Sequence, residues 1–548
     1  MPAQMSPSGR RDRPLDSFGV PLDAMVPGRL LEQAAQANRS RPFLSYGAGI
    51  VSVGEVDQSS ARVAGGLRDL GVRAGDFVGI MLANGAAFID TYFAIGKLGA
   101  AAVTINPAYR GYLLEYVLRD TGCTTLIVDA SCLAAVIEAA AGLATLPRLV
   151  VVGDHADTAQ HVPYADLSSA DAVNVVDAVR FTDTNCVIYT SGTTGPSKGV
   201  PISNAHAVAK ALEVVRVCDV VETDVIFSPL PLFHSMALLR GVLVALITGS
   251  QCVLAERFSV SKYWDEVRRT GATVGHCVFS IPAMLKKAPP LETDRDHTLR
   301  CLYNAREDAE FEQRFGVRLI EGYGLTEAGV AMYMRSDDPS RPGSCGRVSE
   351  DWEVQLVDDD DRPVAVGAVG EIVLRPKFPW LVTSGYLNKP EATAATFRNL
   401  WFHTGDLATV DEDGFYYFRD RKKDAIRRRG ENVSSWELEQ VLLEHPAVEA
   451  AAAIPFPSPV GEDDIRVIVS LHPDADVSAA DLAAHCERRL PLFMVPRYIE
   501  IYPELPRTPT GRIQKYALRE RPLGPAHYDR GDIRTSHAAA TTQAPADR

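Results

Sequence analysis

Short runs of consecutive apolar residues, separated by stretches of helical length, recur through about the first 330 residues of the chain. Examples are residues 77–82 (FVGIML), 125–129 (TLIVD), 149–152 (LVVV) and 186–190 (CVIYT). Strands that are apolar on both faces and alternate with helices are typical of mostly parallel sheets covered by helices. The pattern therefore predicts an α/β fold. The longer run at 241–249 predicts a buried helix, because a membrane span needs about 20 apolar residues.

The pattern changes after residue 345. Acidic turns and glycines separate short strands at residues 371–374 and 415–418, and a charged run at 419–424 precedes a new helix at 435–444. This change predicts an N-terminal domain of residues 1–422 and a C-terminal domain of residues 423–523. Residues 524–548 are rich in Ala, Thr, His and Pro and lack apolar periodicity, which predicts a disordered tail.

Composition narrows the class of protein. A chain of 548 residues is too long to fold around one hydrophobic core. Its formal net charge of −14 argues against nucleic acid or an anionic membrane as the main partner. The nine cysteines show neither CxxC nor Cys/His metal spacing, which predicts reduced thiols in a cytoplasmic protein. No apolar run follows the N-terminal arginines, so we expect no secretory signal.

A loop rich in Ser, Thr and Gly follows the run CVIYT. It reads TSGTTGPSKG from Thr190 to Gly199, and Ser203 then stands where a helix N-cap is expected. Glycines permit close approach of a ligand, hydroxyls and backbone N–H groups donate to phosphate oxygens, and the lysine adds positive charge. The spacing differs from that of the P-loop, GxxxxGK[ST]. The predicted phosphate site comprises Thr190, Ser191, Gly192, Thr193, Thr194, Gly195 and Lys198.

This loop resembles the phosphate loop of the adenylate-forming superfamily, which includes acyl-CoA synthetases, adenylation domains and firefly-luciferase-like enzymes. Further motifs follow in the family's order: GYGLTE at 322–327, WFHTGD at 401–406, DR at 420–421, RGENV at 429–433 and LPRTPTG at 505–511. Around YGLTE, HTGD and RGENVS the chain is most similar to the crotonobetaine/carnitine-CoA ligase branch. The resemblance implies a large N-terminal domain of two helix-flanked β-sheets with a small distorted β-barrel, followed by a small mobile α+β domain.

The resemblance also implies roles on the nucleotide side of the site. ATP carries four negative charges, and a hard cation with oxygen ligands is the usual way to organise them. The implied residues are Tyr323 on adenine, Thr326 on phosphate, Glu327 as the Mg²⁺ ligand, Asp406 on the ribose hydroxyls, Phe418 near adenine, Arg421 on ribose or phosphate, and Lys423 as the hinge. The alternatives are a structural aspartate at 406 and an ordinary surface lysine at 423.

On the acyl side, His234 in PLFHSM matches a position that borders the acyl pocket and the thiol channel, with a core histidine as the alternative. The implied pocket walls are Val278, Phe279, Ser280, Asn304, Ala305 and Gly322. Many relatives carry a Gly-Gly-Ala-type turn where this chain reads YNAR at 303–306. We therefore expect a reshaped acyl pocket, and the sequence does not identify its acid.

The implied chemistry has two steps. The acid attacks the α-phosphate of ATP to form acyl-AMP and pyrophosphate, and the thiol of coenzyme A then attacks acyl-AMP. Relatives use the lysine of a C-terminal Thr-Gly-Lys motif for the first step, whereas Arg512 stands here, and Lys515 aligns with a second basic position. Arginine keeps the charge but not the compact geometry. The substitution predicts weak or absent adenylation, with acyl-AMP supplied by a separate adenylating enzyme; a two-step ligase that tolerates arginine is the other interpretation.

The resemblance also implies that one motif lines the pantetheine tunnel. This motif comprises Arg429, Gly430, Glu431 and Asn432. With residues 427 and 428, Arg429 forms either a basic patch for the phosphates of coenzyme A or a solvated turn. Two other functions stay open: a free-standing enzyme that loads a carrier protein, and a catalytically dead nucleotide-binding protein. The resemblance leaves a homodimer open as well.

Overall fold

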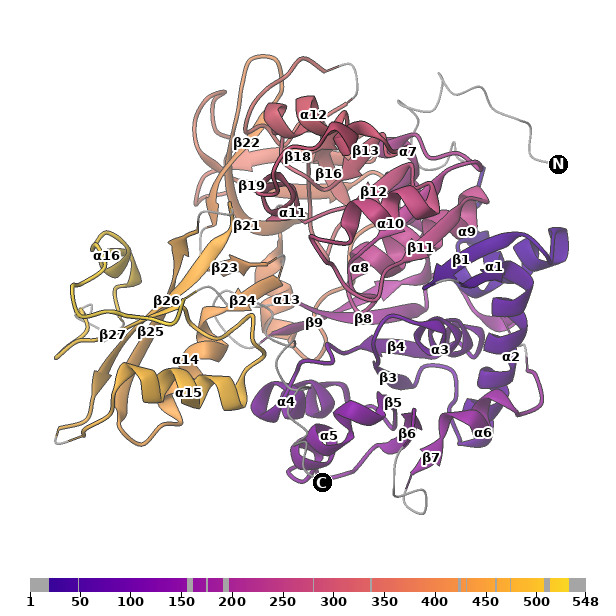
Figure 1. Ribbon diagram of the computed structural model, residues 1–548, viewed down its shortest axis with the longest axis horizontal. Coiled ribbons are helices and arrows are strands. Elements are labelled where there is room, and N and C mark those ends of the chain that lie inside the picture. The colour runs from indigo at the N-terminus through magenta and orange to yellow at the C-terminus, as the bar shows by residue number, and fades with distance from the viewer. Residues whose placement is uncertain are drawn as a thin grey trace, which may run out of the picture. The chain divides into compact units, whose positions relative to one another are not determined.

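The computed structural model describes residues 19–531, apart from residues 48, 155–160, 174–175, 191–196, 279, 336–337, 422–424, 430, 459–460, 474 and 507–512. The described residues divide into two compact units (Figure 1). The first unit contains those up to residue 421, and the second contains those from residue 425 onward. The predicted hinge residue Lys423 lies outside the described residues.

One seven-stranded sheet of the first unit has the order β7-β6-β5-β3-β4-β8-β9 and is parallel except for β9. The four apolar runs lie in four of its seven strands, as predicted. The strands are β3 (Phe77–Met81), β4 (Ala101–Thr104), β5 (Thr125–Asp129), β6 (Arg148–Val152), β7 (Val162–Pro163), β8 (Thr184–Thr190) and β9 (Lys198–Ser203). The helices are α2 (Val53–Asp69), α3 (Ala86–Lys97), α4 (Gly111–Thr121), α5 (Leu133–Ala140) and α6 (Tyr164–Ser168).

The second seven-stranded sheet has the order β14-β13-β12-β10-β11-β1-β2, and only β2 runs antiparallel to its neighbour. Its strands are β1 (Pro42–Tyr46), β2 (Gly49–Ser52), β10 (Val225–Ser228), β11 (Gln251–Leu254), β12 (Val274–His276), β13 (Cys301–Tyr303) and β14 (Arg318–Ile320). The accompanying helices are α1 (Pro27–Ala37), α7 (Asn204–Cys218), α8 (Ser235–Ala237), η6 (Leu238–Val242), α9 (Leu243–Thr248), α10 (Tyr263–Thr270), α11 (Ser280–Lys286) and α12 (Ala309–Phe315).

Helix α7 is buried along all 15 residues, including Lys210, Glu213 and Arg216. One hydrophobic cluster joins both sheets through side chains such as Val78 and Phe227. The apolar run at 241–249 is helical and buried as predicted, but its first turn belongs to a π-helix, η6. The first unit therefore has a continuous core in which charged side chains of α7 need internal partners.

The turn-rich region after residue 345 forms a curled antiparallel sheet, which corresponds to the small distorted β-barrel that the resemblance implied. Its strands are β18 (Trp352–Val357), β19 (Gly370–Pro376), β20 (Phe397–Arg398), β21 (Trp401–Val410) and β22 (Tyr416–Arg421), with helix α13 (Pro390–Thr396). A three-stranded sheet of β15 (Gly322–Gly324), β16 (Val330–Tyr333) and β17 (Arg347–Val348) precedes it along the chain.

The second unit pairs a short hairpin with a four-stranded sheet, β25-β26-β27-β28. Its elements are β23 (Ala425–Arg428), β24 (Glu431–Ser434), α14 (Ser435–Leu443), β25 (Val448–Pro457), β26 (Asp463–Leu471), α15 (Ala479–Arg489), β27 (Tyr498–Ile501), α16 (Lys515–Arg519) and β28 (Tyr528–Asp529). The tail prediction was wrong at its start, since β28 pairs with β27 and the Arg497 guanidinium donates to Asp529 at 3.1 Å. Short strands of this kind carry little apolar pattern of their own.

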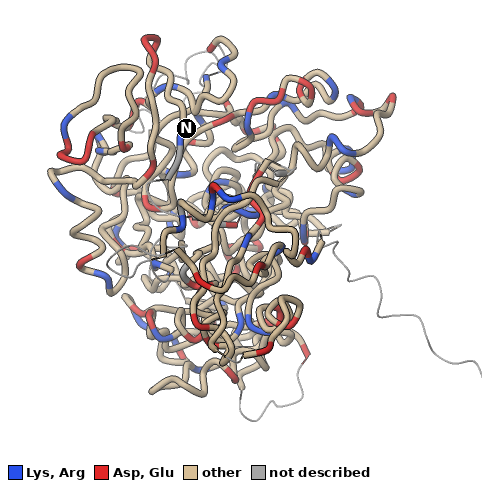
Figure 2. Tube along the Cα trace, turned by 90° about the vertical axis from the view of Figure 1, so that its left-hand side faces the viewer, with Lys and Arg blue, Asp and Glu red and all other residues tan. Residues whose placement is uncertain are grey.

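Figure 2 shows basic and acidic residues intermixed along the trace of the described residues rather than separated onto two faces. Within the described part of the chain, no helix is both long and apolar enough to cross a membrane.

Candidate functional site

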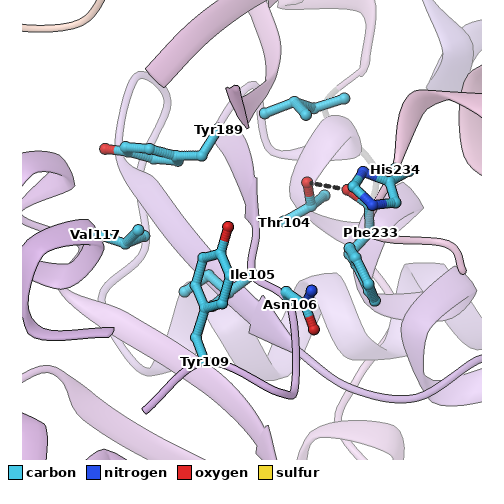
Figure 3. Close-up of a pocket in the computed structure, with 9 residues that line it drawn as sticks. Thr104, Ile105, Asn106, Tyr109, Val117, Tyr189, Phe233 and His234 are labelled. Carbon is cyan, nitrogen blue, oxygen red and sulfur yellow. Dashed lines mark hydrogen bonds between the residues drawn. The ribbon is translucent and has the colours of Figure 1, made fainter. Parts of the chain in front are cut away.

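The carboxyl ends of strands from both large sheets meet in the first unit. The Asn84 amide, just after β3, donates to the carbonyls of Leu230 and Ala255 at 3.0 and 2.9 Å. The Thr104 hydroxyl, at the end of β4, donates to the carbonyl of Phe233 at 2.9 Å (Figure 3). Ligands of α/β sheets bind beyond the carboxyl ends of their strands. The predicted site residues of the first unit follow such strand ends.

The predicted phosphate loop connects β8 to β9, whose register places Thr190 opposite Lys198. Thr190 donates from its hydroxyl to the carbonyl of Lys198 at 3.5 Å. The Ser203 hydroxyl accepts from the N–H of His206 at 3.1 Å, which confirms the predicted N-cap of α7. The loop residues between the two strands, Ser191, Gly192, Thr193, Thr194 and Gly195, lie outside the described residues.

Tyr386 joins the phosphate and metal sides of the predicted site. The Lys198 ammonium lies 4.3 Å from the centre of the Tyr386 ring, and the Tyr386 hydroxyl donates to the Glu327 carboxylate at 3.0 Å. The Glu327 carbonyl also accepts from the N–H of Thr383 at 2.7 Å. The segment around residues 383–387 therefore holds Glu327 close to the phosphate strand. No local motif marks Tyr386, so the sequence pattern could not have identified it.

Tyr323 and Asp406, predicted to contact adenine and ribose, lie together. Tyr323 on β15 donates from its hydroxyl to the Asp406 carboxylate at 2.6 Å, and both side chains are buried. The register of β21 and β22 places Asp406 opposite Arg421, whose side chain lies outside the description. Phe418, on the same strand as Arg421, has 38% of its surface exposed. These positions lie on two sheets, with Tyr323 on β15 and Asp406, Phe418 and Arg421 on the paired strands β21 and β22.

A buried lysine supports the loop that carries Thr326 and Glu327. Lys210 of α7 donates to the carbonyls of Leu325, at 3.2 Å, and Ala328. Burial, followed by the nearby Arg240, lowers the pKa of Lys210 well below its ordinary value. Since these two carbonyls flank the predicted phosphate and metal residues, the lysine positions them. The sequence reading did not include it.

On the acyl side, His234 precedes α8 and is half-buried, with its ring 4.6 Å from that of Phe233. It lines a narrow cavity together with Tyr109, Tyr189 and Asn106, as Figure 3 shows. The remaining lining residues are Thr104, Ile105, Val117, Ile188 and Phe233. The structure places His234 at the wall of a small cavity, and its role at the acyl pocket stays a prediction.

The departure at residues 303–306 has a structural explanation. Asn304 has φ 66°, a left-handed conformation that asparagine tolerates better than most residues, and its amide donates to the carbonyl of Cys277 at 3.1 Å. Asparagine thus serves the turn that glycine serves in many relatives. Ala305 is buried, Val278 is half-buried, and a Cβ at Gly322 would lie 3.2 Å from the carbonyl of Met332.

Two predicted pocket residues are not placed in full. Phe279 lies outside the described residues, and Ser280 is described only as the first residue of α11.

Glu321 is a further residue that no motif indicated. It directly precedes Gly322 and is buried, which raises the pKa of its carboxyl to about 7. Its carboxylate accepts from the N–H of Glu307 at 3.3 Å, and Arg306 lies 4.0 Å away. A carboxyl group that titrates near neutral pH therefore lies under the turn between the acyl and nucleotide sides.

In the second unit, the motif predicted for the pantetheine tunnel forms the hairpin of β23 and β24. Arg429 is exposed in its turn with φ 56°, Glu431 is half-buried, and the side chain of Asn432 lies outside the description, as does Gly430. The idea of three arginines in one basic patch was wrong for Arg428. That side chain is buried, lies 3.3 Å from Asp464 and donates to the carbonyl of Val495.

Lys515 is held inside the second unit, on α16. Its ammonium lies 2.7 Å from the Glu439 carboxylate and donates to the Ser435 hydroxyl at 2.9 Å. Burial raises the pKa of Glu439, and the charge of Lys515 lowers it in part. Arg512, the predicted adenylation cation, lies outside the described residues. Lys515 is therefore engaged in a structural ion pair.

The fold and the site define a class. Residues 31–387 match the model of the AMP-binding enzyme family, and residues 437–512 match that of the AMP-binding enzyme C-terminal domain. The chain belongs to this family of adenylate-forming enzymes.

Among its relatives is the crotonobetaine/carnitine–CoA ligase of Salmonella typhimurium, 31% identical over 479 residues, which are 85% of this chain and 93% of the relative. This result confirms the branch that the motifs indicated. The o-succinylbenzoate CoA synthetase of Bacillus subtilis, bound to a product analogue, matches with a TM-score of 0.79 at 28% identity, over 90% of this chain and 98% of that one. An anthranilate CoA ligase in complex with anthranoyl-AMP matches with a TM-score of 0.68 at 28% identity, over 91% and 98%.

Proposed function

We propose that this enzyme is an AMP-forming acyl-CoA ligase that converts acyl-AMP and coenzyme A into acyl-CoA more efficiently than it makes acyl-AMP. The observation that carries the nucleotide chemistry is the chain of contacts from Lys198 through Tyr386 to Glu327, beside the bonded pair of Tyr323 and Asp406. The Lys198 cation would bind phosphate, and the Glu327 carboxylate would bind the metal ion. The Tyr323 ring would contact adenine, and the Asp406 carboxylate would bind ribose. Relatives that carry ligase names support the thioester product.

The residues fit a magnesium ion that arrives with ATP. Magnesium in such sites keeps several waters and takes one or two protein carboxylates together with phosphate oxygens. Glu327 supplies one carboxylate, and Tyr386 and Thr383 fix its orientation through a side-chain and a backbone hydrogen bond. The bound ion would supply positive charge to the triphosphate. Lys198 and Thr190 would bind phosphate oxygens, and Asp406 would accept from the ribose hydroxyls.

The proposed imbalance between the two steps rests on residues 512 and 515. Adenylation brings the substrate carboxylate to a phosphate, so it needs a cation placed between two anions. The planar guanidinium of Arg512 presents its charge over a wider fork than a lysine ammonium does. Lys515 does not replace it, because Glu439 and Ser435 hold its ammonium. Thioester formation starts from a neutral carbonyl of acyl-AMP and does not require this cation.

Arg512→Lys tests the proposal. Pyrophosphate release from ATP is measured across a panel of acids, and thioester formation is measured separately from synthetic acyl-AMP and coenzyme A. We expect the variant to adenylate about 10- to 100-fold faster than the wild type, with thioester formation changed less than about twofold. Lys515→Met is the matched control, expected to lower the stability of the second unit without raising adenylation.

Equal rates of the two steps in the wild type, together with no gain in Arg512→Lys, would contradict the imbalance and leave an ordinary two-step ligase. Replacing coenzyme A by a phosphopantetheinylated carrier protein in the same assay decides between the two thiols. Thioester formed only on the carrier protein would contradict the acyl-CoA product.

A further inference from the structure

A buried arginine lies next to the predicted acyl site without a full set of partners. Arg240 follows His234 by six residues, sits on the π-helical turn η6, and has 5% of its surface exposed. Single π-turns inside helices occur frequently at functional sites. A guanidinium with no exposed surface must satisfy five N–H donors inside the protein. The contacts of Arg240 therefore show whether it is structural or awaits a ligand.

Among the described contacts of Arg240, the one to a carboxylate is long. One terminal nitrogen donates to the Ser235 hydroxyl at 3.2 Å, and the other lies 3.9 Å from the Glu213 carboxylate, beyond hydrogen-bond distance. Among the described residues, neither the Arg240 Nε nor the Glu213 Oε2 has a hydrogen-bond partner, although both are buried. A buried charge pair this loose leaves both ions poorly compensated.

A second buried arginine, Arg216 on α7, forms a close ion pair with which Arg240 can be compared. Arg216 lies 2.5 Å from the Asp351 carboxylate and donates to the Ser349 hydroxyl at 3.0 Å. Both arginines are buried to a similar degree, yet among the described contacts Arg216 has a carboxylate at 2.5 Å and Arg240 has one at 3.9 Å. The difference indicates that the ion pair with Glu213 does not by itself fix the position of the Arg240 guanidinium.

Few negative charges are described close to Arg240. Its described carboxylate neighbour is Glu213, which together with Glu327 also raises the pKa of Lys210, one helical turn away on α7. Burial, followed by Arg240, lowers the pKa of His276 to about 3, so that ring stays neutral. Arg240 likewise contributes to the lowered pKa of Lys210. An anion bound to Arg240 would offset the part of both shifts that comes from Arg240, and not the part that comes from burial.

Arg240 lies next to the turn that was predicted to line the acyl pocket. Its guanidinium faces the phenol of Tyr303, the residue before Asn304 in the departing turn. Glu213 abuts the loop after Glu327, since a Cβ on Gly329 would lie 1.7 Å from its carboxylate. Along the helix, six residues separate Arg240 from His234 by about 9 Å. The cation thus lies within the length of a small organic acid from the histidine at the channel.

We propose that Arg240 binds a second anionic group on the acid substrate and makes this enzyme selective for dicarboxylic acids over their monocarboxylic counterparts. The proposal rests on the ligase function proposed above. Arginine binds a carboxylate through two parallel N–H donors, which supplies the partners that Arg240 lacks. Tyr303 and Ser235 would orient that carboxylate, and Glu213 would contact the opposite side of the guanidinium.

The test measures binding of stable acyl-adenylate mimics to the full-length enzyme by calorimetry. Acyl-sulfamoyl adenosines are compared in matched pairs, such as hexanoyl with 5-carboxypentanoyl and benzoyl with its carboxylated analogues. We expect the wild type to bind the carboxylated member of at least one pair about 10-fold or more tightly. In Arg240→Met, that preference should fall by about 100-fold, because a buried carboxylate is left without its partner.

Two further variants keep the proposal falsifiable if Arg240→Met folds poorly. Glu213→Gln removes the competing carboxylate and should strengthen binding of the carboxylated analogue by about 10-fold, with the other member of the pair unchanged. Arg216→Met is the matched control: it should lower the melting temperature without changing the preference. A structural role for Arg240 would lower stability in all three variants and leave the preference unmoved.

The outcomes separate the inference from the function on which it rests. Analogues that bind equally well with and without the second carboxylate, or a preference that survives in Arg240→Met, overturn the role of Arg240 alone. Failure of every analogue to bind, together with no thioester from acyl-AMP and coenzyme A, overturns the ligase function and the inference with it.

Discussion

The nucleotide side and the acyl side of the site are built differently, although both use the carboxyl ends of strands in the same unit. On the nucleotide side, short bonds connect the predicted residues to one another, as in the 2.6 Å bond between Tyr323 and Asp406. On the acyl side, Tyr303 and Asn304 depart from the turn of many relatives, and Arg240 has only long contacts.

This difference separates the nucleotide side, which serves the same ligand throughout the family, from the acyl side, where this chain has residues of its own. ATP presents the same phosphates, ribose and adenine to every member, so the groups that bind it can be satisfied by one another before it arrives. The acid differs among the relatives, and in this chain we propose that its pocket depends on side chains such as Arg240 and Tyr303, which no general motif requires. Three substitutions break or sharpen this contrast.

Removing the charge of Glu327 should have the largest effect. Glu327→Gln can still accept from Tyr386, so the loop keeps its shape, but the metal loses its protein carboxylate. In an Arg512→Lys background, we expect adenylation to fall by about 10²–10³, measured as pyrophosphate release, with thioester formation from acyl-AMP changed only a few-fold. The exposed Glu310→Gln is the control. Equal loss in both steps would show that Glu327 serves the whole site and not the nucleotide side.

Glu321, where the two sides meet, should make stability depend on pH. Its pKa in the folded enzyme, about 7, is raised above the ordinary 4.5, so its contribution to stability is complete below 4.5 and is lost as pH rises to 7. Glu321→Gln lacks this loss. Relative to the wild type, the variant should gain about 3 kcal/mol between pH 4 and pH 8 in urea unfolding of the first unit. The same difference at both pH values would show that Glu321 is not titrating in this range.

Asn304 tests the acyl side, with a smaller effect. Asn304→Ala loses the hydrogen bond to Cys277 and places a side chain that tolerates the left-handed conformation poorly, for about 2 kcal/mol of lost stability. Asn304→Gly loses only the hydrogen bond, so about 1 kcal/mol is expected. Both should raise the KM for the acid and leave the KM for ATP unchanged. A rise in both KM values would mean that the turn supports the two sides together.

Much of the fold was predictable from local pattern. The apolar runs at 77–82 and 125–129 became strands of one sheet because burial on both faces requires an unbroken apolar stretch. The cap at Ser203 followed from its hydroxyl and its place before a helix. The strand at Tyr528–Asp529 was missed, because two residues held by an ion pair to Arg497 leave no periodic signal.

The sequence by itself determined the family and the order of the motifs, and it predicted the positions that face the nucleotide, because those depend on residue types at fixed spacing along the chain. Only the tertiary structure decided which side chains from distant segments meet. It brought Tyr386 to Glu327, tied Lys515 to Glu439, buried Arg428 against Asp464 and, among the described contacts, placed the Glu213 carboxylate 3.9 Å from Arg240. The reason is physical: a contact depends on distances in the folded chain, and residues separated by dozens of positions acquire those distances only when the whole core packs.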